Sequence, residues 1–233
     1  LFNAIGSKAL IIGTVQRGDR YSTIIQKDSK YTDWSELKGK IVGTCFGTGA
    51  ELVLRKYFLT RPDLSWDDFE WVNIKTEDMI ATLDKGQIEA FTVWAPTGEI
   101  AEAQGVGKSL ISYGDVSLVP VCIHTTREFA ENNKDLIVRF LAAHLKKEDM
   151  IKNNPSLAAK YANKAAKDMG VNIDASAFEI MFKRINFQID FDESIIEELK
   201  NTAEFLISQG KIKEMPEFFW DTSYIEEAKR LVK

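Results

Sequence analysis

The stretch GKIVGTCFGTGAELVLRKYF, residues 39–58, decides the fold of this chain. It runs from an apolar, β-branched segment through three closely spaced glycines into a segment with helical spacing, which predicts a strand, a tight turn and a helix. At such a turn, free backbone amides and the positive end of the helix dipole point toward one place. The turn is therefore a candidate site for a ligand group.

A capped helix start is the alternative interpretation of the same turn. TGAE, at Thr48–Glu51, matches the capping box. In that motif Thr48 accepts a hydrogen bond from the amide of Glu51, and Glu51 accepts one from the amide of Thr48. The stretch lacks the Gly-Lys-Ser/Thr of a Walker A loop and the spacing of a dinucleotide fingerprint. Both interpretations, ligand site and capped helix, stay open.

Residues 40–113 alternate between strand and helix periodicity. The strand-like segments KIVGTCF, FEWVNI and IEAFTVW are followed by helical patterns, of which TEDMIATLDK stops at Gly86. This alternation predicts consecutive β–α units with a largely parallel sheet. Trp94 and Pro96 follow the third strand, at its carboxyl end, where ligands sit in open α/β sheets. We expect them on the same rim as the glycine turn, although Trp94 would serve equally well as a core aromatic.

Two strand-like segments, YSTIIQKDS and SLVPVCIHTT, flank this unit, and we interpret them as paired crossings between two lobes. The chain then turns helical. An apolar stripe is expected at Leu136, Ile137, Phe140, Leu141 and Leu145, and further helices at 155–169, 176–187, 194–208 and 222–232. These helices have few strands to cover, so we expect another β–α–β portion to precede residue 1 in the intact protein.

The composition and the reactive side chains exclude several classes of function. The net charge of −5 argues against a nucleic-acid partner. No apolar run approaches the roughly 20 residues of a transmembrane helix. Cys45, Cys122, His124 and His144 show no zinc spacing, and no serine nucleophile elbow is present. Only His124, at the end of a crossing strand, is a candidate to face a cleft. We predict no catalytic residue, no metal site and no cofactor.

Three segments carry a resemblance to a known family: Trp34–Lys40, Asp78–Glu89 and Asn154–Ala162. They resemble solute-binding proteins of ABC importers in the nitrate, sulfonate and taurine family, whose relatives bind thiamine-precursor pyrimidines. The resemblance covers residues 9–170. It implies an α/β, type II periplasmic-binding-protein fold, with two α/β lobes joined by paired hinge strands. Residues 1–28 would be part of lobe 1, residues 29–117 lobe 2, and residues 118–233 the return to lobe 1.

The resemblance also implies a binding cleft and a partner. The ligand-binding residues it implies are Gln16, Phe46, Gly47, Thr48, Gly49, Ala50, Trp94, Pro96, Asp115 and Val119. The expected partners are a small-molecule ligand and the membrane permease of an ABC importer, and the protein is expected to be a monomer, periplasmic or lipid-anchored. Two departures from the family pattern matter: Thr97 replaces a tyrosine, and Glu51 brings a carboxylate to the turn. The charge of the ligand stays open.

Two other functions fit the same fold. One is an enzyme of the thiamine-pyrimidine or menaquinone biosynthesis type, which would need a reactive histidine or a cysteine-rich motif in the cleft. The other is the effector domain of a transcription regulator, whose DNA-binding half would precede residue 1.

Overall fold

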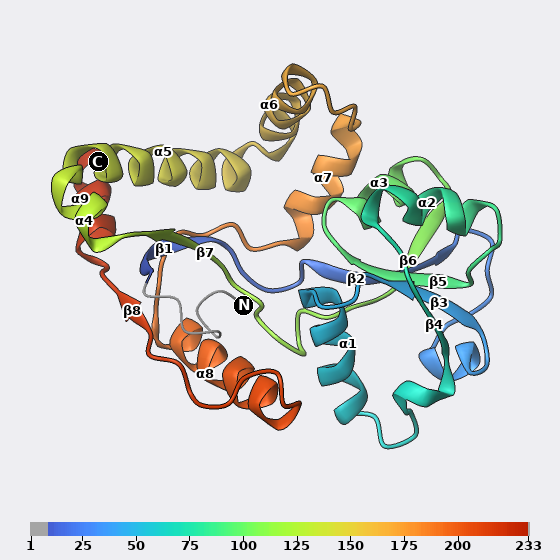
Figure 1. Cartoon of the computed structure of the whole chain (residues 1–233). Helices are drawn as coiled ribbons and strands as arrows, with labels where there is room; N and C mark the ends of the chain where they lie inside the picture. Colours follow the sequence, from blue (N-terminus) through green and yellow to red (C-terminus); the bar gives the residue numbers. More distant parts are fainter. Residues whose placement is uncertain (1–8, 233) are drawn as a thin grey trace. The chain divides into compact units, whose positions relative to one another are not determined.

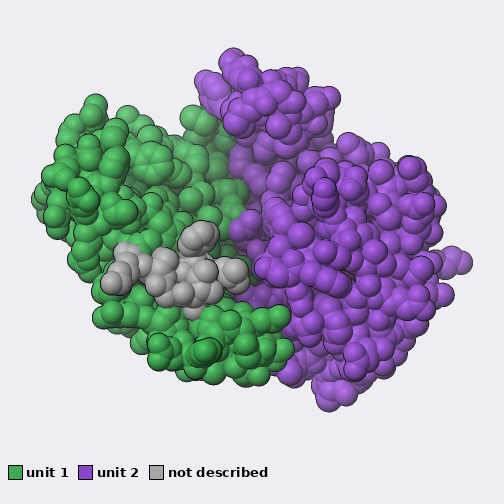
Figure 2. Space-filling view, in the orientation of Figure 1, with its two compact units in different colours: residues 1–17, 118–158, 186–233 green, residues 18–117, 159–185 purple. Residues whose placement is uncertain are grey.

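The computed structural model describes residues 9–232. These residues form two compact units, coloured separately in Figure 2. Unit 1 comprises residues 9–17, 118–158 and 186–232, and unit 2 comprises residues 18–117 and 159–185. These boundaries differ from the predicted segments 1–28, 29–117 and 118–233, because residues 18–28 and 159–185 both belong to unit 2. The first eight residues of predicted lobe 1 lie outside the described residues.

Unit 2 is built on a mixed five-stranded sheet with the order β4-β3-β5-β2-β6. The strands are β2 (Tyr21–Gln26), β3 (Ile41–Thr44), β4 (Glu70–Asn73), β5 (Ala90–Trp94) and β6 (Gly107–Ser112). Strands β3, β4 and β5 are parallel, as predicted from the alternation in residues 40–113, but β6, in the same segment, pairs antiparallel with β2. Strand β2 is also antiparallel to β5.

Helices cover both faces of this sheet (Figure 1). Helices α2 (Thr76–Asp84) and α3 (Thr97–Ala103) lie on one face and α1 (Gly49–Leu59) on the other. On the first face, Phe91 and Val93 of β5 pack with Met79 and Leu83 of α2. On the α1 face, the rings of Trp34 and Phe69 meet edge to face, in a cluster that the short 3-10 helices η2 (Trp34–Leu37) and η3 (Trp66–Asp68) help to form.

The segment 159–185 contributes two helices that belong to unit 2. Helix α6 (Pro155–Asp168) begins in unit 1 and continues in unit 2, and α7 (Ala175–Arg184) follows it. Phe178 of α7 packs with Ala159 and Ala166 of α6. The buried carboxylate of Glu99 on α3 forms an ion pair with Arg184, which ties the end of α7 to the sheet-bearing part of unit 2.

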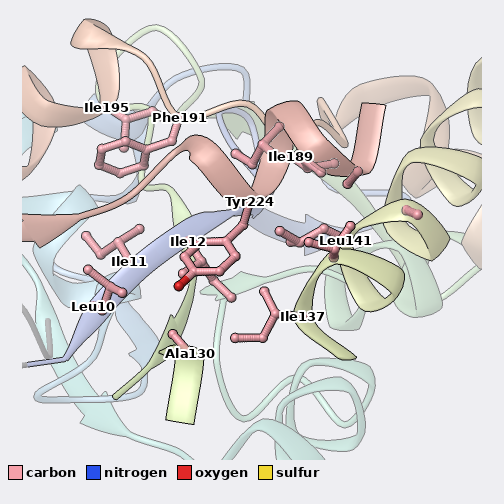
Figure 3. Close-up of a cluster of buried hydrophobic side chains, with 14 of the residues drawn as sticks. Leu10, Ile11, Ile12, Ala130, Ile137, Leu141, Ile189, Phe191, Ile195 and Tyr224 are labelled. Atoms are coloured by element: carbon pink, nitrogen blue, oxygen red, sulfur yellow. The ribbon is translucent and has the colours of Figure 1, made fainter. Parts of the chain in front are cut away.

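Unit 1 has a three-stranded sheet in the order β7-β1-β8. Its strands are β1 (Leu10–Gln16), β7 (Val121–Thr125) and β8 (Phe219–Trp220), and its helices are α4 (Arg127–Asn132), α5 (Lys134–Asn153), α8 (Glu193–Ser208) and α9 (Ser223–Leu231). The core of this unit gathers Leu10, Ile11 and Ile12 of β1 with side chains of the helices (Figure 3). The helices predicted at 194–208 and 222–232 are therefore confirmed.

The two segments predicted as crossings lie inside the units. Residues 21–26 form β2, which pairs with β5 and β6 in unit 2, whereas residues 121–125 form β7, which pairs with β1 in unit 1. The chain passes from one unit to the other just before each segment, at residues 17–18 and 117–118, and again at 158–159 and 185–186. Strands pair with residues far away in the chain. The positions of residues 21–26 and 121–125 in the sequence therefore did not show which strands they pair with.

The predicted apolar stripe of α5 is confirmed in part. Ile137 and Leu141 are buried and Leu145 packs against the same core, but Leu136 is 50% exposed and Phe140 48% exposed. The buried face continues instead through Val138 and Ala142. Residues 137, 138, 141 and 142 share one side of a helix with 3.6 residues per turn, and residues 136 and 140 lie at its margin.

Candidate functional site

The candidate site lies at one edge of the sheet of unit 2. Because β3, β4 and β5 are parallel, the residues that follow them meet at the same edge. Strand β2 runs the opposite way, and its first residue, Tyr21, is paired with Trp94, the last residue of β5. We call this region the strand-end edge: Tyr21, residues 45–50, Asn73 and residues 94–96. It includes seven of the ten predicted ligand residues.

Thr48 caps helix α1, as predicted, but the predicted reciprocal hydrogen bonds of a capping box are not formed. The hydroxyl of Thr48 accepts a hydrogen bond from the amide of Ala50 at 3.2 Å and donates one to the carbonyl of Cys45 at 2.6 Å. The carboxylate of Glu51 accepts from the amide of Gly47 at 2.7 Å, one residue before the expected partner. The turn at Gly47, where φ is +73°, brings that amide rather than the amide of Thr48 to the carboxylate.

Side chains already occupy three amides of the turn. The amide of Phe46 donates to Oδ1 of Asn73 at 3.0 Å, and those of Gly47 and Ala50 donate to Glu51 and Thr48. Within residues 9–232, the amides of Thr48 and Gly49 have no acceptor. These two N–H groups, at the positive end of the α1 dipole, are the donors that the turn leaves available.

Tyr21 lies against the first residue of α1. A Cβ atom added to Gly49 would stand 2.1 Å from the hydroxyl oxygen of Tyr21. Tyr21 is 6% exposed, and its hydroxyl forms no hydrogen bond with a described residue. Burial raises the pKa of Tyr21, and the nearby charge of Arg20 opposes this shift. Glycine at position 49 is thus needed for close packing against Tyr21, which the sequence analysis did not foresee.

Arg20 adds a positive charge beside Tyr21. Its guanidinium carbon lies over the ring of Tyr21, 5.2 Å from the centroid. Its Nε atom is buried without a partner, and no ion pair is formed with it among residues 9–232. Sequence reasoning missed both Arg20 and Tyr21, because only the antiparallel pairing of β2 with β5 brings them to this edge. The sequence of residues 21–29 alone contains no motif that indicates a ligand-binding residue.

A buried polar network lies behind the strand-end edge. The hydroxyl groups of Thr23 and Thr92 are 2.6 Å apart, and Nε1 of Trp34 donates to the hydroxyl of Tyr113 at 2.9 Å. Thr44 donates to the carbonyl of Thr92 at 3.2 Å. Burial raises the pKa of Tyr113 well above its ordinary value, so this hydroxyl stays protonated. The network links β2, β3 and β5 behind the edge.

Trp94 serves both the core and the edge. It is partly buried, and it packs against the cluster formed by Phe91 and its neighbours. Pro96 follows through a cis peptide bond and precedes α3, which begins at Thr97. Thr97, which replaces the tyrosine of the family pattern, is therefore the first residue of α3.

The other predicted ligand residues lie away from the strand-end edge in sequence and are split between the units. Gln16 ends β1 and Val119, with φ of +35°, precedes β7, both in unit 1, whereas Asp115 belongs to unit 2. Their role in binding stays a prediction.

The candidate reactive side chains do not form a metal site. Both cysteines are free, and burial raises the pKa of Cys122 to about 11. His124 lies on β7 and His144 is half-buried beside Phe140, and partial desolvation lowers the pKa of each imidazole. Among residues 9–232 no group of histidine, cysteine and acidic side chains is arranged to hold a metal ion. In the same residues, no helix combines the length and the apolar character needed to cross a membrane.

Three solved structures illustrate what the fold is similar to. The periplasmic aliphatic sulphonate-binding protein SsuA of Escherichia coli matches with a TM-score of 0.76 and 18% identity, covering 97% of this chain and 70% of that chain. The periplasmic nitrate-binding protein NrtA of Synechocystis PCC 6803 matches with a TM-score of 0.67 and 15% identity, covering 97% and 68%. The desulfurization enzyme DSZB matches with a TM-score of 0.72 and 15% identity, covering 97% and 80%.

These matches confirm the predicted fold, an α/β periplasmic-binding-protein-like fold with two mixed sheets. The fold is shared by binding proteins and by an enzyme. Among curated protein sequences, none matches the chain. The model of the NMT1-like family matches residues 6–166. Because that match extends over more than half of the 233 residues, the chain belongs to the NMT1-like family.

Proposed function

We propose that this protein is the extracytoplasmic substrate-binding component of an ABC importer and that it captures a small organic or inorganic solute. The strand-end edge carries this proposal, because two amides at the start of α1 and the hydroxyl of Tyr21 lie there without partners among the described residues. Membership of the NMT1-like family and the fold shared with SsuA and NrtA, which bind a sulphonate and nitrate, support it.

The proposal includes a change of conformation and a partner. Solute bound at the strand-end edge draws the two units together, and Gln16 and Val119 of unit 1 join the predicted ligand residues of unit 2. The closed, monomeric form then meets the permease of the importer. The proposed location is the periplasm or the outer face of a membrane, by analogy with the periplasmic proteins of the same fold.

The similarity to DSZB makes an enzyme the second candidate. An enzyme at the strand-end edge would need a nucleophile or a base there. Both histidines of the sequence lie in unit 1, and Cys45 is the thiol at the edge. Cys45 shares its carbonyl with the cap of α1, but no base is hydrogen-bonded to its sulfur among residues 9–232. Binding therefore explains the edge with fewer additional groups than catalysis.

Native mass spectrometry of the protein as purified tests the proposal. A binding protein should retain a small molecule with unchanged covalent structure, and adding that molecule back should reduce the radius of gyration measured by solution scattering. Conversion of the added molecule into a product would favour the enzyme. A radius of gyration that stays the same with a molecule proven to bind would contradict closure of the two units.

A further inference from the structure

Arg184 lies between two carboxylates of unit 2. Its guanidinium forms an ion pair with the buried carboxylate of Glu99 on α3, and its Nε atom lies 4.0 Å from Oδ2 of Asp19. Hydrogen bonding is incomplete on both sides of the ion pair. Oε2 of Glu99 and Nε of Arg184 are buried, and neither has a hydrogen-bond partner among residues 9–232. Arg184 therefore keeps an unused donor with a second carboxylate close to it.

Asp19 and Arg184 both lie near places where the chain passes between the units. Asp19 closely follows the passage at residues 17–18, and Arg184, the last residue of α7, closely precedes the passage at 185–186. Oδ1 of Asp19 also accepts a hydrogen bond from the amide of Gly114 at 3.1 Å. Gly114 in turn precedes the passage at 117–118. Asp19 is thus in contact with the segments that lead to two other passages.

The backbone of Asp19 has an uncommon conformation. Its φ angle is +33°, in the left-handed region that few residues other than glycine adopt. Gly114 packs directly against it, since a Cβ atom added to Gly114 would stand 2.8 Å from Cβ of Asp19. Residues held in such conformations depend on the contacts around them. A change in the partners of the Asp19 carboxylate should therefore be felt at Gly114.

The charge of Glu99 determines how strongly Arg184 is held on α3. Glu99 is fully buried, and burial raises its pKa, although the charge of Arg184 opposes this shift and the charge of Glu102 on the same helix adds to it. A protonated carboxyl holds a guanidinium less strongly than a carboxylate does. The side chain of Asp19 is 27% exposed, so water solvates its carboxylate, unlike that of Glu99.

We propose that Asp19, Glu99 and Arg184 form a latch that one proton sets. With Glu99 charged, the latch holds Arg184 on α3. When Glu99 takes up a proton from the solvent, Arg184 moves to Asp19, on the segment that follows the passage at 17–18. The latch thus couples proton uptake at a buried residue to the segments that lead between the units. This inference does not rest on the proposed function, because no solute takes part in it.

NMR spectroscopy of the 15N-labelled chain follows both ends of the latch. Between about pH 8 and pH 4, the signals of the Arg184 Nε–H group and the Gly114 amide should shift together. Their common midpoint should lie above 4.5, the ordinary pKa of a glutamate carboxyl. The amide of Leu83, a fully buried residue of α2, reports whether the fold persists over this range and should not follow the same transition.

Three variants identify the groups involved. Glu99→Gln has no proton to gain, so it should abolish the transition and show at pH 8 the Gly114 signal that the parent shows at low pH. Glu102→Gln removes a neighbouring carboxylate of α3 and should keep the transition, with a slightly lower midpoint. Asp19→Asn keeps an acceptor for the Gly114 amide but loses the charge, so Gly114 should no longer respond while Glu99 still titrates.

The latch is overturned if the Gly114 signal of the parent shows no transition while that of Arg184 does. It is also overturned if Glu99→Gln keeps the transition, or if Asp19→Asn leaves the response of Gly114 unchanged. The parent and Asp19→Asn decide the question even where Glu99→Gln does not fold, since the side chain of Asp19 is partly exposed. Proven capture of a solute would leave the latch unaffected, and the loss of the latch would leave solute binding unaffected.

Discussion

The substitution Gly49→Ala sets two opposing effects against each other at the start of α1. Alanine is favoured over glycine in helices by about 0.5–1 kcal/mol, so helix propensity alone predicts a more stable protein. The contact with Tyr21 predicts the reverse. The new methyl group would stand 2.1 Å from the hydroxyl oxygen of Tyr21 and 2.8 Å from the ring carbon that bears it.

The contact should outweigh the propensity. Tyr21 is 6% exposed, so its ring has little room to move away. Overpacking of buried sites costs about 1–3 kcal/mol. At the midpoints of the two ranges, about 2 kcal/mol for overpacking and about 0.75 kcal/mol for helix propensity, the net loss in the free energy of unfolding is about 1 kcal/mol. The double variant Gly49→Ala with Tyr21→Phe lacks the 2.1 Å contact and should recover part of this loss, with a coupling of about 1 kcal/mol.

Urea unfolding of the parent, both single variants and the double variant measures this cycle. If Gly49→Ala is as stable as the parent or more stable, the packing of Tyr21 on Gly49 is refuted. A double variant that is no better than the sum of the two single variants would show that the loss arises elsewhere. The same cycle bears on ligand studies, since a bulky residue at position 49 would displace Tyr21 and weaken binding without touching the ligand.

Three further predictions concern parts of the molecule away from this contact. Arg184→Met removes the partner of the buried carboxylate of Glu99 and should cost about 3 kcal/mol of unfolding free energy, and adding Glu99→Gln should restore most of it in urea unfolding. Arg61 lowers the pKa of Asp33 from 3.8, so the stability this pair contributes is present above that pH and is lost as the pH falls toward the folded-state value. Asp33→Asn should therefore flatten the fall of the urea midpoint between about pH 5 and pH 2, and an unchanged slope would assign the acid sensitivity to other carboxylates. Leu141→Ala, at a fully buried position of α5, should cost about 2–5 kcal/mol, whereas Phe140→Ala should cost less than about 1 kcal/mol, and equal losses would contradict the observed face of the helix.

Much of unit 2 could be predicted because each of its strands and helices is marked by a pattern within its own segment of the sequence. The strands at 41–44, 70–73 and 90–94 and the helices that follow them each carry their own periodicity and stop signals, so each segment could be assigned without its neighbours. The carboxyl-end rule then placed the glycine turn and Trp94 on one edge. No local sequence pattern indicates that residues 159–185 belong to unit 2. Their place depends on contacts with distant residues, such as the ion pair of Arg184 with Glu99.

The candidate site was predicted only in part, for the same reason. The glycine turn and the cap at Thr48 were visible in the sequence, but the partner of Glu51 moved by one residue, because the conformation of Gly47 decides which amide faces the carboxylate. Tyr21 entered the site through strand pairing with Trp94, 73 positions later in the chain. The six residues of β2 show that the segment is a strand, but they do not show that it pairs with β5.

The two interpretations of the glycine turn, a capped helix or a ligand site, are compatible in the observed geometry. Thr48 and Glu51 satisfy the amides of Ala50 and Gly47, which stabilises the first turn of α1 and fixes the path of the chain. The same cap engages the carboxylate of Glu51 and leaves the amides of Thr48 and Gly49 without acceptors among residues 9–232. Gly49 then admits the hydroxyl of Tyr21 beside those amides, where any side chain would exclude it. A helix terminus that is rigid before its ligand arrives has less conformational entropy to lose on binding, so in the proposed function the cap would favour binding as well as folding.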